Sequence, residues 1–130
     1  MASNTDELDQ LKEALRLSEE RFRMASQATD DTMWDWDLPT GHLWWGQNLY
    51  KTFLYAPEDV EADITSWTIR IHPDDVERVT ASIHGCIDKG DKYWTNEYRF
   101  LCKDGTYRDV LDRGFVQHDS AGVPVRMVGA

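Results

Sequence analysis

The stretch from Trp94 to Gly114 contains two strand-like runs that flank the pair Asp104-Gly105. Polar and apolar side chains alternate through both runs, which is the period of a β-strand. Asp-Gly is favoured where two adjacent turn residues need positive φ, so the pair predicts a type I′ hairpin turn. A hairpin of two strands is not stable alone in water. We therefore expect the rest of the chain to supply further strands and a helical layer.

The two faces of this hairpin carry different side chains. One face holds aromatic residues, among them Tyr98 and Phe100, and we expect it to meet the helices. The other face is only partly polar and includes Arg99, Leu101 and Leu111. A sheet face that meets only water is usually polar. The pattern therefore predicts that this second face docks the N-terminal helix or a second subunit.

Composition limits the class of protein. The chain has 130 residues, of which 41% are hydrophobic, and this suffices for one domain with a core. Its formal net charge of −10 argues against binding to nucleic acids or to an anionic membrane surface. Two cysteines, Cys86 and Cys102, form no disulfide framework, and no signal peptide or apolar span is present. We expect a cytoplasmic location, which a parent protein anchored in a membrane would also allow.

Residues 5–27 predict a helix with apolar side chains at alternating spacings of three and four. Two interpretations stay open, because the run is shorter than three heptads. The helix either packs on its own domain or forms the seam of a parallel homodimer. We assign residues 1–27 to this helical extension and residues 28–130 to the domain. The apolar residues of the candidate interface are Leu8, Leu11, Leu15 and Phe22.

The remaining chain predicts an α+β fold with a five-stranded antiparallel sheet and helices on one face. Leu49, Phe53 and Leu54 should point inward from a helix that Asn48 opens. A longer helix should start at Pro73 and end at Gly90. The other predicted strands and short helical segments are 33–38, 42–46, 57–60, 64–69 and 123–128.

No catalytic sequence motif is present, so we expect no enzymatic activity in this chain. Asp35 and Asp37 alternate along a strand, which predicts a polar sheet face rather than an acid–base pair. His72, Asp74 and Asp75 include metal-ligand residue types. Helix capping is the simpler interpretation of these three residues, and we predict no metal site.

Several motifs in this order resemble a PAS domain of the kind found in bacterial sensor histidine kinases and diguanylate cyclases. The matching segments cover nearly the whole chain and read LSEERFRMA, MWDWDLPTGHLWW, IHPDDVERV, EYRFLCKDGTYRDVLDRG and DSAGVPVRMVG. The resemblance implies the strand order 2-1-5-4-3 and helices that enclose a candidate ligand cavity. Asp109 stands where the family often has an aromatic residue. The Asp-(Ile/Val)-Thr motif that leads to an effector domain is missing, so we expect an excised sensor module.

Relatives with cofactors give two further expectations. The Asn-Cys-Arg-Phe motif of flavin-adduct relatives is absent. Haem-binding relatives take an axial histidine from the helix before the long hairpin, where His84 lies. On a helical wheel His84 falls roughly 90° from the centre of the apolar stripe, at ~100° per residue. We therefore predict that His84 is a surface or boundary residue and that the chain binds neither haem nor flavin.

A cavity for a small organic ligand is the remaining candidate site. The alternative is that the same aromatic side chains fill the core. A polar ligand would be oriented by Asn96, by Tyr98 or by indole N–H groups without a protein partner. The residues predicted to line the cavity are Trp34, Trp36, Phe53, Trp67, Val79, Ile83, Asn96, Tyr98, Phe100 and Val110.

The functional prediction is a non-catalytic sensory and dimerisation module of a bacterial signal-transduction protein. Its parent would be a histidine kinase or a cyclic-di-GMP enzyme, and it would relay a small-ligand or partner signal to an output domain absent from this chain. The alternative is a ligand-free interaction scaffold with a filled core. A small-molecule enzyme stays open only if convergent polar groups meet in a cleft.

Overall fold

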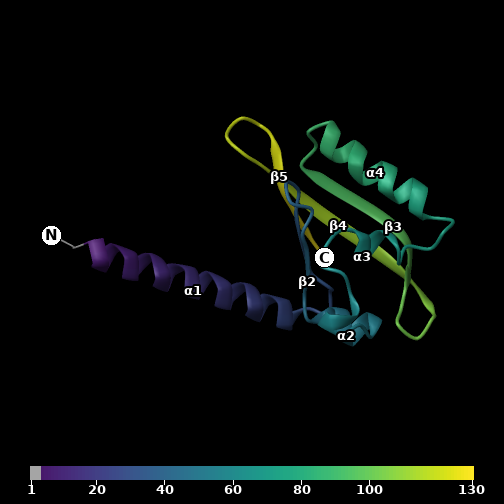
Figure 1. Cartoon of the computed structure of the whole chain (residues 1–130), viewed down its shortest axis with the longest axis horizontal. Coiled ribbons are helices and arrows are strands. Elements are labelled where there is room, and N and C mark those ends of the chain that lie inside the picture. Colours follow the sequence, from purple (N-terminus) through teal and green to yellow (C-terminus); the bar gives the residue numbers. More distant parts are fainter. Residues whose placement is uncertain (1–3) are drawn as a thin grey trace. The chain divides into compact units, whose positions relative to one another are not determined.

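The structure of the protein is a computed structural model that describes residues 4–130. The described chain forms two compact units, which meet between Asp30 and Asp31 in the sequence. The first unit contains one helix, α1 (Asn4–Ala28), and the second contains the sheet and the other helices (Figure 1). The boundary expected after residue 27 falls within the last turn of α1 and stays a prediction.

The second unit is built on a five-stranded antiparallel sheet in the order β2-β1-β5-β4-β3, which confirms the predicted topology. The last strand, β5, lies at the centre, where it pairs with β1 on one side and β4 on the other. The five strands are β1 (Trp34–Asp37), β2 (Leu43–Trp45), β3 (Tyr93–Leu101), β4 (Tyr107–His118) and β5 (Pro124–Gly129).

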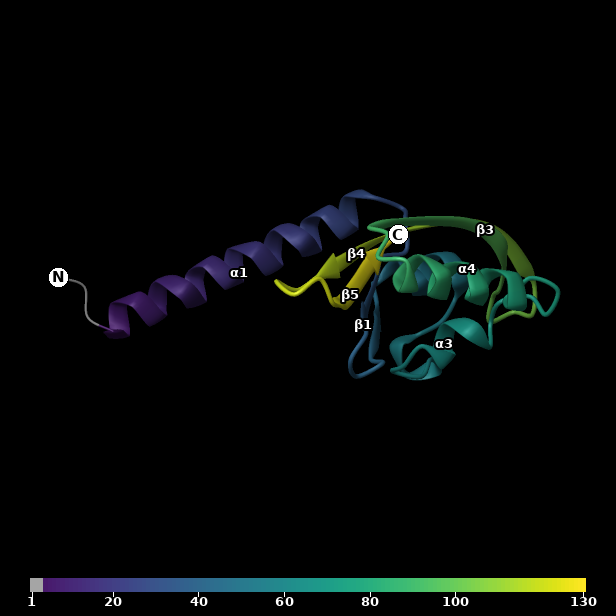
Figure 2. The same ribbon diagram turned by 90° about the horizontal axis from the view of Figure 1, so that it is seen from above.

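The helices of the second unit cover one face of this sheet (Figure 2). The longest is α4, whose apolar stripe buries Val79 and Ile83 and half-buries Val76 and Ile87. Aromatic residues from the strands meet this helical layer, because alternate positions of each strand point to the same face. The helical segments are α2 (Asn48–Phe53), the 3-10 helix Pro57–Asp59, α3 (Thr65–Thr68) and α4 (Val76–Asp88).

The turn of the long hairpin differs from the predicted type I′ turn. Gly105 has φ of +88°, but Asp104 does not have positive φ, since Leu54 is the only non-glycine residue with positive φ between residues 4 and 130. The Gly105 N–H donates to the Cys102 carbonyl (3.0 Å), and the Asp104 carboxylate accepts from the Thr106 N–H (3.0 Å). This is the arrangement of a turn closed by one left-handed glycine. The Asp side chain stabilises the loop without itself adopting positive φ.

The start of α4 also differs from the prediction. The helix begins at Val76 rather than at Pro73, and Asp75 makes no side-chain capping hydrogen bond. The Asp75 carboxylate instead accepts from the backbone N–H (2.9 Å), Nε (3.0 Å) and Nη2 (2.9 Å) of Arg99 on β3. These hydrogen bonds hold the pKa of Asp75 well below its usual range. Asp75 therefore ties the helix to the sheet, and the capping interpretation is wrong for this residue.

Leu54 does not point inward as predicted. It is 42% exposed and ends α2 with φ of +71°. Its N–H donates to the Tyr50 carbonyl (2.9 Å), so this residue supplies the left-handed C-cap that glycine more often provides. The inward positions of α2 are Leu49 and Phe53, which are both buried.

Candidate binding site between the sheet and the helices

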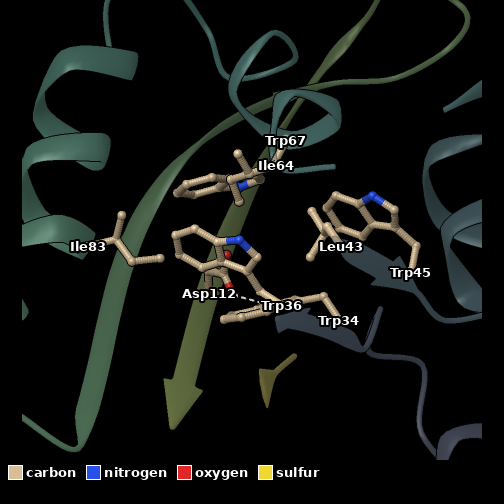
Figure 3. Close-up of a pocket in the computed structure, with 8 residues that line it drawn as sticks. All are labelled: Trp34, Trp36, Leu43, Trp45, Ile64, Trp67, Ile83 and Asp112. Atoms are coloured by element: carbon tan, nitrogen blue, oxygen red, sulfur yellow. Dashed lines mark hydrogen bonds between the residues drawn. The ribbon is translucent and has the colours of Figure 1, made fainter. Parts of the chain in front are cut away.

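A small cavity lies between the sheet and the helices (Figure 3). Its volume is about 10 Å³, which is room for about one water molecule. Two indoles from β1 and the side chain of Asp112 from β4 meet side chains from β2, α3 and α4 around it. The lining residues are Trp34, Trp36, Leu43, Trp45, Ile64, Trp67, Ile83 and Asp112.

Asp112 is a carboxylate buried within this aromatic surround, with 7% of its surface exposed. It accepts hydrogen bonds from the indole Nε1 of Trp34 (2.8 Å) and from the hydroxyl of Tyr98 (2.6 Å). The Tyr98 oxygen in turn accepts from Nε1 of Trp67 (2.7 Å). Burial raises the pKa of Asp112 to about 6, and the hydrogen bonds from Tyr98 and Trp34 oppose part of that rise. This network links β1, β3, β4 and α3.

Trp36 brings the second polar feature of the cavity. Its Nε1 is buried and has no hydrogen-bond partner among residues 4–130. A buried N–H without a partner costs free energy that a hydrogen-bond acceptor in the cavity would recover. Figure 3 shows the Trp36 indole among the lining side chains, between Ile83 and Leu43. The cavity therefore offers one free donor to an incoming group.

The structure divides the ten residues that the sequence proposed for the cavity. Trp34, Trp36, Trp67 and Ile83 line it. Four others are buried in the surrounding core, namely Phe53, Val79, Tyr98 and Phe100. Asn96 and Val110 are half-buried and do not line it.

Two of the predicted ligand-orienting groups already have protein partners. The Asn96 side-chain oxygen accepts a hydrogen bond from Nη1 of Arg78 (2.6 Å). The Tyr98 hydroxyl donates to Asp112, as described above. Among the indoles, those of Trp34, Trp45, Trp67 and Trp94 donate to protein side chains, and Trp36 is the exception noted above.

Sequence reasoning missed Leu43, Trp45, Ile64 and Asp112 as lining residues. For Asp112 a signal existed, because the alternation of β4 places it on the same face as Val110 and Val116. A charged residue at an inward position of a strand is unusual unless its charge is compensated. That signal identifies the position but not the residues that bond to it.

The residues that the sequence singled out as candidate cofactor or metal ligands can now be placed in the structure. His84 is exposed, as its place on the helical wheel predicted. No group of three or more His, Cys, Asp or Glu side chains suited to a metal occurs among residues 4–130. Cys86 and Cys102 are buried free thiols, and burial raises the pKa of Cys86. The expectation of neither haem nor flavin stays a prediction.

The candidate interface residues are mostly exposed. Leu111 on β4 is 48% exposed, whereas Leu101 is half-buried and Arg99 is engaged with Asp75. None of the helices in the described residues is both long and apolar enough to span a membrane. The α1 residues are each at least 44% exposed: Leu8, Leu11, Leu15 and Phe22.

A family model for the PAS fold matches residues 42–130, which is more than half of the chain. The chain belongs to the PAS-fold family. A PAS domain is a sensory module of signal-transduction proteins. The match confirms the family that the sequence motifs resembled.

Solved PAS structures support the same conclusion. A sensory box histidine kinase/response regulator from Burkholderia thailandensis is 33% identical, with a TM-score of 0.67 over 84% of this chain and 80% of that one. The N-terminal domain of a diguanylate cyclase with a PAS/PAC sensor from Marinobacter aquaeolei is 22% identical. Its TM-score is 0.69 over 75% of this chain and 89% of that one, which shows a shared fold.

One curated relative is a sensor from Methanosarcina acetivorans. The methyl sulfide methyltransferase-associated sensor is 35% identical over 68 residues, which are 52% of this chain. That match spans only 7% of the length of the sensor. The PAS domain described here therefore corresponds to a small part of such a protein.

Proposed function

We propose that this PAS domain is a non-catalytic sensory and dimerisation module of a cytoplasmic bacterial signalling protein. It would relay a small-ligand or partner signal to an output domain of a histidine kinase or a cyclic-di-GMP enzyme. The proposal of dimerisation rests on the exposed apolar seam of α1. The sensory half follows from family membership and from the free donor in the cavity.

The seam of α1 consists of Leu8, Leu11, Leu15 and Phe22, spaced by three, four and seven residues. Their exposed fractions are 50%, 68%, 60% and 44%. Water-exposed leucines at heptad spacing are stabilised when a second helix covers them. In proteins, most of the stability of a helix comes from packing of its apolar face rather than from its intrinsic helix propensity. A parallel pairing with the α1 helix of a second copy accounts for both the spacing and the exposure.

The outer face of the sheet offers a second apolar surface on the PAS domain. The rings of Tyr93 and Phe115 lie 5.5 Å apart on it and are 77% and 41% exposed. Tyr107 and Leu111 on β4 are also more than 40% exposed. Exposed apolar side chains on a sheet face are a feature of interaction surfaces. A second copy of the chain is the occupant that would use this face and the α1 seam together.

The interior supports two functional alternatives. Ligand sites for organic molecules usually exceed 300 Å³, whereas this cavity measures about 10 Å³. That small volume favours a second candidate function, a ligand-free PAS scaffold that signals through partners. The free Trp36 N–H favours a sensor whose side chains rearrange around a small ligand. Thermal-shift screening with metabolites distinguishes them, since only the sensor gains stability from a compound.

The dimer is tested by sedimentation of the full chain and of two variants with matched changes. Leu11→Asp places a charge in the seam and should convert the dimer into a monomer. Leu17→Asp is the control, because Leu17 lies off the seam of the same helix and is 38% exposed. A full-length chain that sediments as a monomer, or two variants that behave alike, would contradict the proposal.

A further inference from the structure

The dimer of α1 proposed above leaves open the register in which its two helices align. In heptad positions, the row along the seam has Leu8, Leu15 and Phe22 at a, and Leu11 and Ser18 at d. Ser18 is thus a polar residue within an apolar row, and it is exposed in the single chain. A polar residue at a seam position lowers the stability of a helix pair but specifies how the two helices align. Ser18 is therefore a candidate determinant of the register.

The Ser18 hydroxyl has a different neighbour in each arrangement of the pair. In a parallel pair in register, it lies opposite Ser18 of the partner subunit, and one hydroxyl can donate a hydrogen bond to the other. In an antiparallel pair whose apolar rows overlap fully, it faces the partner's Leu15 instead. A hydroxyl that loses water without gaining a hydrogen-bond partner costs free energy. The parallel pair in register therefore suits this side chain best.

The charged residues of α1 give a second, independent indication. Away from the seam, Arg16 donates to Glu13 (2.6 Å) and to Glu20 (3.1 Å) of the same helix. Glu7 at position g and Lys12 at position e flank the seam, are exposed, and form no ion pair with another residue of the range 4–130. In parallel helices, position g of one helix lies beside position e of the next heptad of the other. The charges of Glu7 and Lys12 therefore match across a parallel pair.

A slip of one heptad removes both of these matches. Glu7 would then lie beside the partner's Glu19, and two carboxylates in such positions repel each other. Ser18 would face Leu11 or Ala25 of the partner subunit, neither of which can accept a hydrogen bond through its side chain. The aligned register avoids the repulsion and pairs the hydroxyls.

We propose that two copies of α1 pair in parallel and in register, with Ser18 opposite Ser18 of the partner subunit and Glu7 beside the partner's Lys12. The inference rests on the dimer of the proposed function and names the residues that select its partner. A helix that replaced the second copy would need a small polar side chain opposite Ser18 and a cation beside Glu7. These three residues therefore favour a second copy of this chain over other helices with an apolar seam.

The register is tested by oxidation of the Ser18→Cys variant of the full chain. Two cysteines at position d of a parallel pair in register are close enough to form a disulfide, so most of this variant should become a covalent dimer. Glu13→Cys is the matched control and should stay uncrosslinked, because Glu13 is exposed on the side of the same helix that faces away from the seam. The parent chain should also stay uncrosslinked, since Cys86 and Cys102 are buried.

The outcomes separate the register from the dimer itself. If Ser18→Cys sediments as a dimer but forms no disulfide, or if Glu13→Cys crosslinks as readily, the register is wrong and the dimer stands. If Ser18→Cys and the parent chain both sediment as monomers, the proposed dimer is wrong as well.

Charge reversal tests the ion pair between the helices. Glu7→Lys and Lys12→Glu should each weaken dimerisation about threefold at low salt, because each variant replaces attraction by repulsion at two symmetric contacts. The double variant restores opposite charges, so it should recover most of the affinity of the parent chain. A double variant that dimerises as weakly as the single variants would overturn the pairing of Glu7 with the partner's Lys12.

Discussion

Asp112 is the residue whose chemistry most distinguishes the interior of this PAS domain. It is a buried carboxylate that accepts hydrogen bonds from the Trp34 and Tyr98 side chains, and among residues 4–130 it forms no ion pair with a Lys or Arg side chain. Neutral donors compensate a buried charge only partly, because they supply no opposite charge. The carboxylate is therefore easier to protonate in the folded protein than in the unfolded chain. Folding and proton uptake at Asp112 are linked.

The pH dependence that follows has a definite sign. The pKa of Asp112 is about 6 in the folded protein, against 3.8 for an ordinary Asp. Between pH 4 and 6 the folded state binds more protons, so stability due to this group is full below pH 4 and is lost as pH rises through 6. The loss is about 3 kcal/mol. Asp112→Asn cannot titrate, so its stability relative to the parent protein should increase by about this amount from pH 4 to 7.

Urea unfolding at several pH values measures this difference directly. The comparison between parent and variant cancels the other titrating groups, among them Asp75, whose lowered pKa acts in the opposite direction. Asp109→Asn is the matched control, because Asp109 is an exposed carboxylate on the same strand. If the stability difference between Asp112→Asn and the parent protein stays constant with pH, the pKa of Asp112 is not raised by folding, and this account of the carboxylate is wrong.

Sequence reasoning reached part of this residue-level account. The alternation of β4 places Asp112 on the inward face. Its partner Trp34, however, lies 78 positions earlier in the chain, and the bond depends on the sheet order that brings β1 near β4. A local sequence pattern does not show which residues far apart in the chain become neighbours in the fold. The same reason explains why Leu43 and Trp45 were missed as lining residues.

At the scale of elements, β5 is packed so closely at Gly129 that no side chain fits there. A Cβ there would lie 2.1 Å from the Arg113 carbonyl oxygen and 2.3 Å from the Trp34 ring. Neither group is the end of a flexible side chain, so the sheet itself must shift. We expect Gly129→Ala to lower the free energy of unfolding by about 2 kcal/mol or more.

Gly85 provides the matched substitution within α4. A Cβ at this position meets nothing within 4 Å, and alanine favours a helix interior over glycine. Gly85→Ala should therefore raise the free energy of unfolding by about 1 kcal/mol. Both variants are compared with the parent chain by urea unfolding at one pH. If both substitutions changed the free energy of unfolding by the same amount, the structure around Gly129 would accommodate the added Cβ without loss of stability.

The elements themselves were largely predictable, and their ends were not. The period-two pattern predicted the strands, and the apolar stripe predicted α4. The start of α4 was predicted too early in the chain. An Asp just before a helix can either cap the helix or pair with a residue elsewhere in the fold, and the sequence does not show which of these Asp75 does. Capping is the local role, and the ion pair with Arg99 of β3 is the one that the fold uses. Only tertiary contacts decide between them.

At the scale of the whole molecule, the sheet order came from the family resemblance rather than from the residue patterns. Patterns give strands, but the order 2-1-5-4-3 needs knowledge of which strands become neighbours. The role of α1 is open for the same reason. Its heptad spacing is visible in the sequence, whereas a second copy that covered the seam, as we propose, would lie outside the single chain.

Dimerisation should therefore be visible in the stability of α1. This helix contains about half of the α-helical residues of the protein, so far-UV circular dichroism reports on it. If α1 is stabilised by a second copy, its melting temperature must rise with protein concentration. The sheet unit Asp31–Ala130 should melt in a separate transition, because it has a hydrophobic core of its own.

The measurement is a series of melting curves over a hundredfold range of protein concentration. Dilution should lower the temperature of the first transition and reduce the helical signal, because α1 loses the packing of its apolar face when the dimer dissociates. In Leu11→Asp the signal should already be low at every concentration, while Leu17→Asp should follow the parent chain. A helical signal independent of concentration in the parent would mean that α1 is stabilised within one chain, and the seam would then have no second copy to bind.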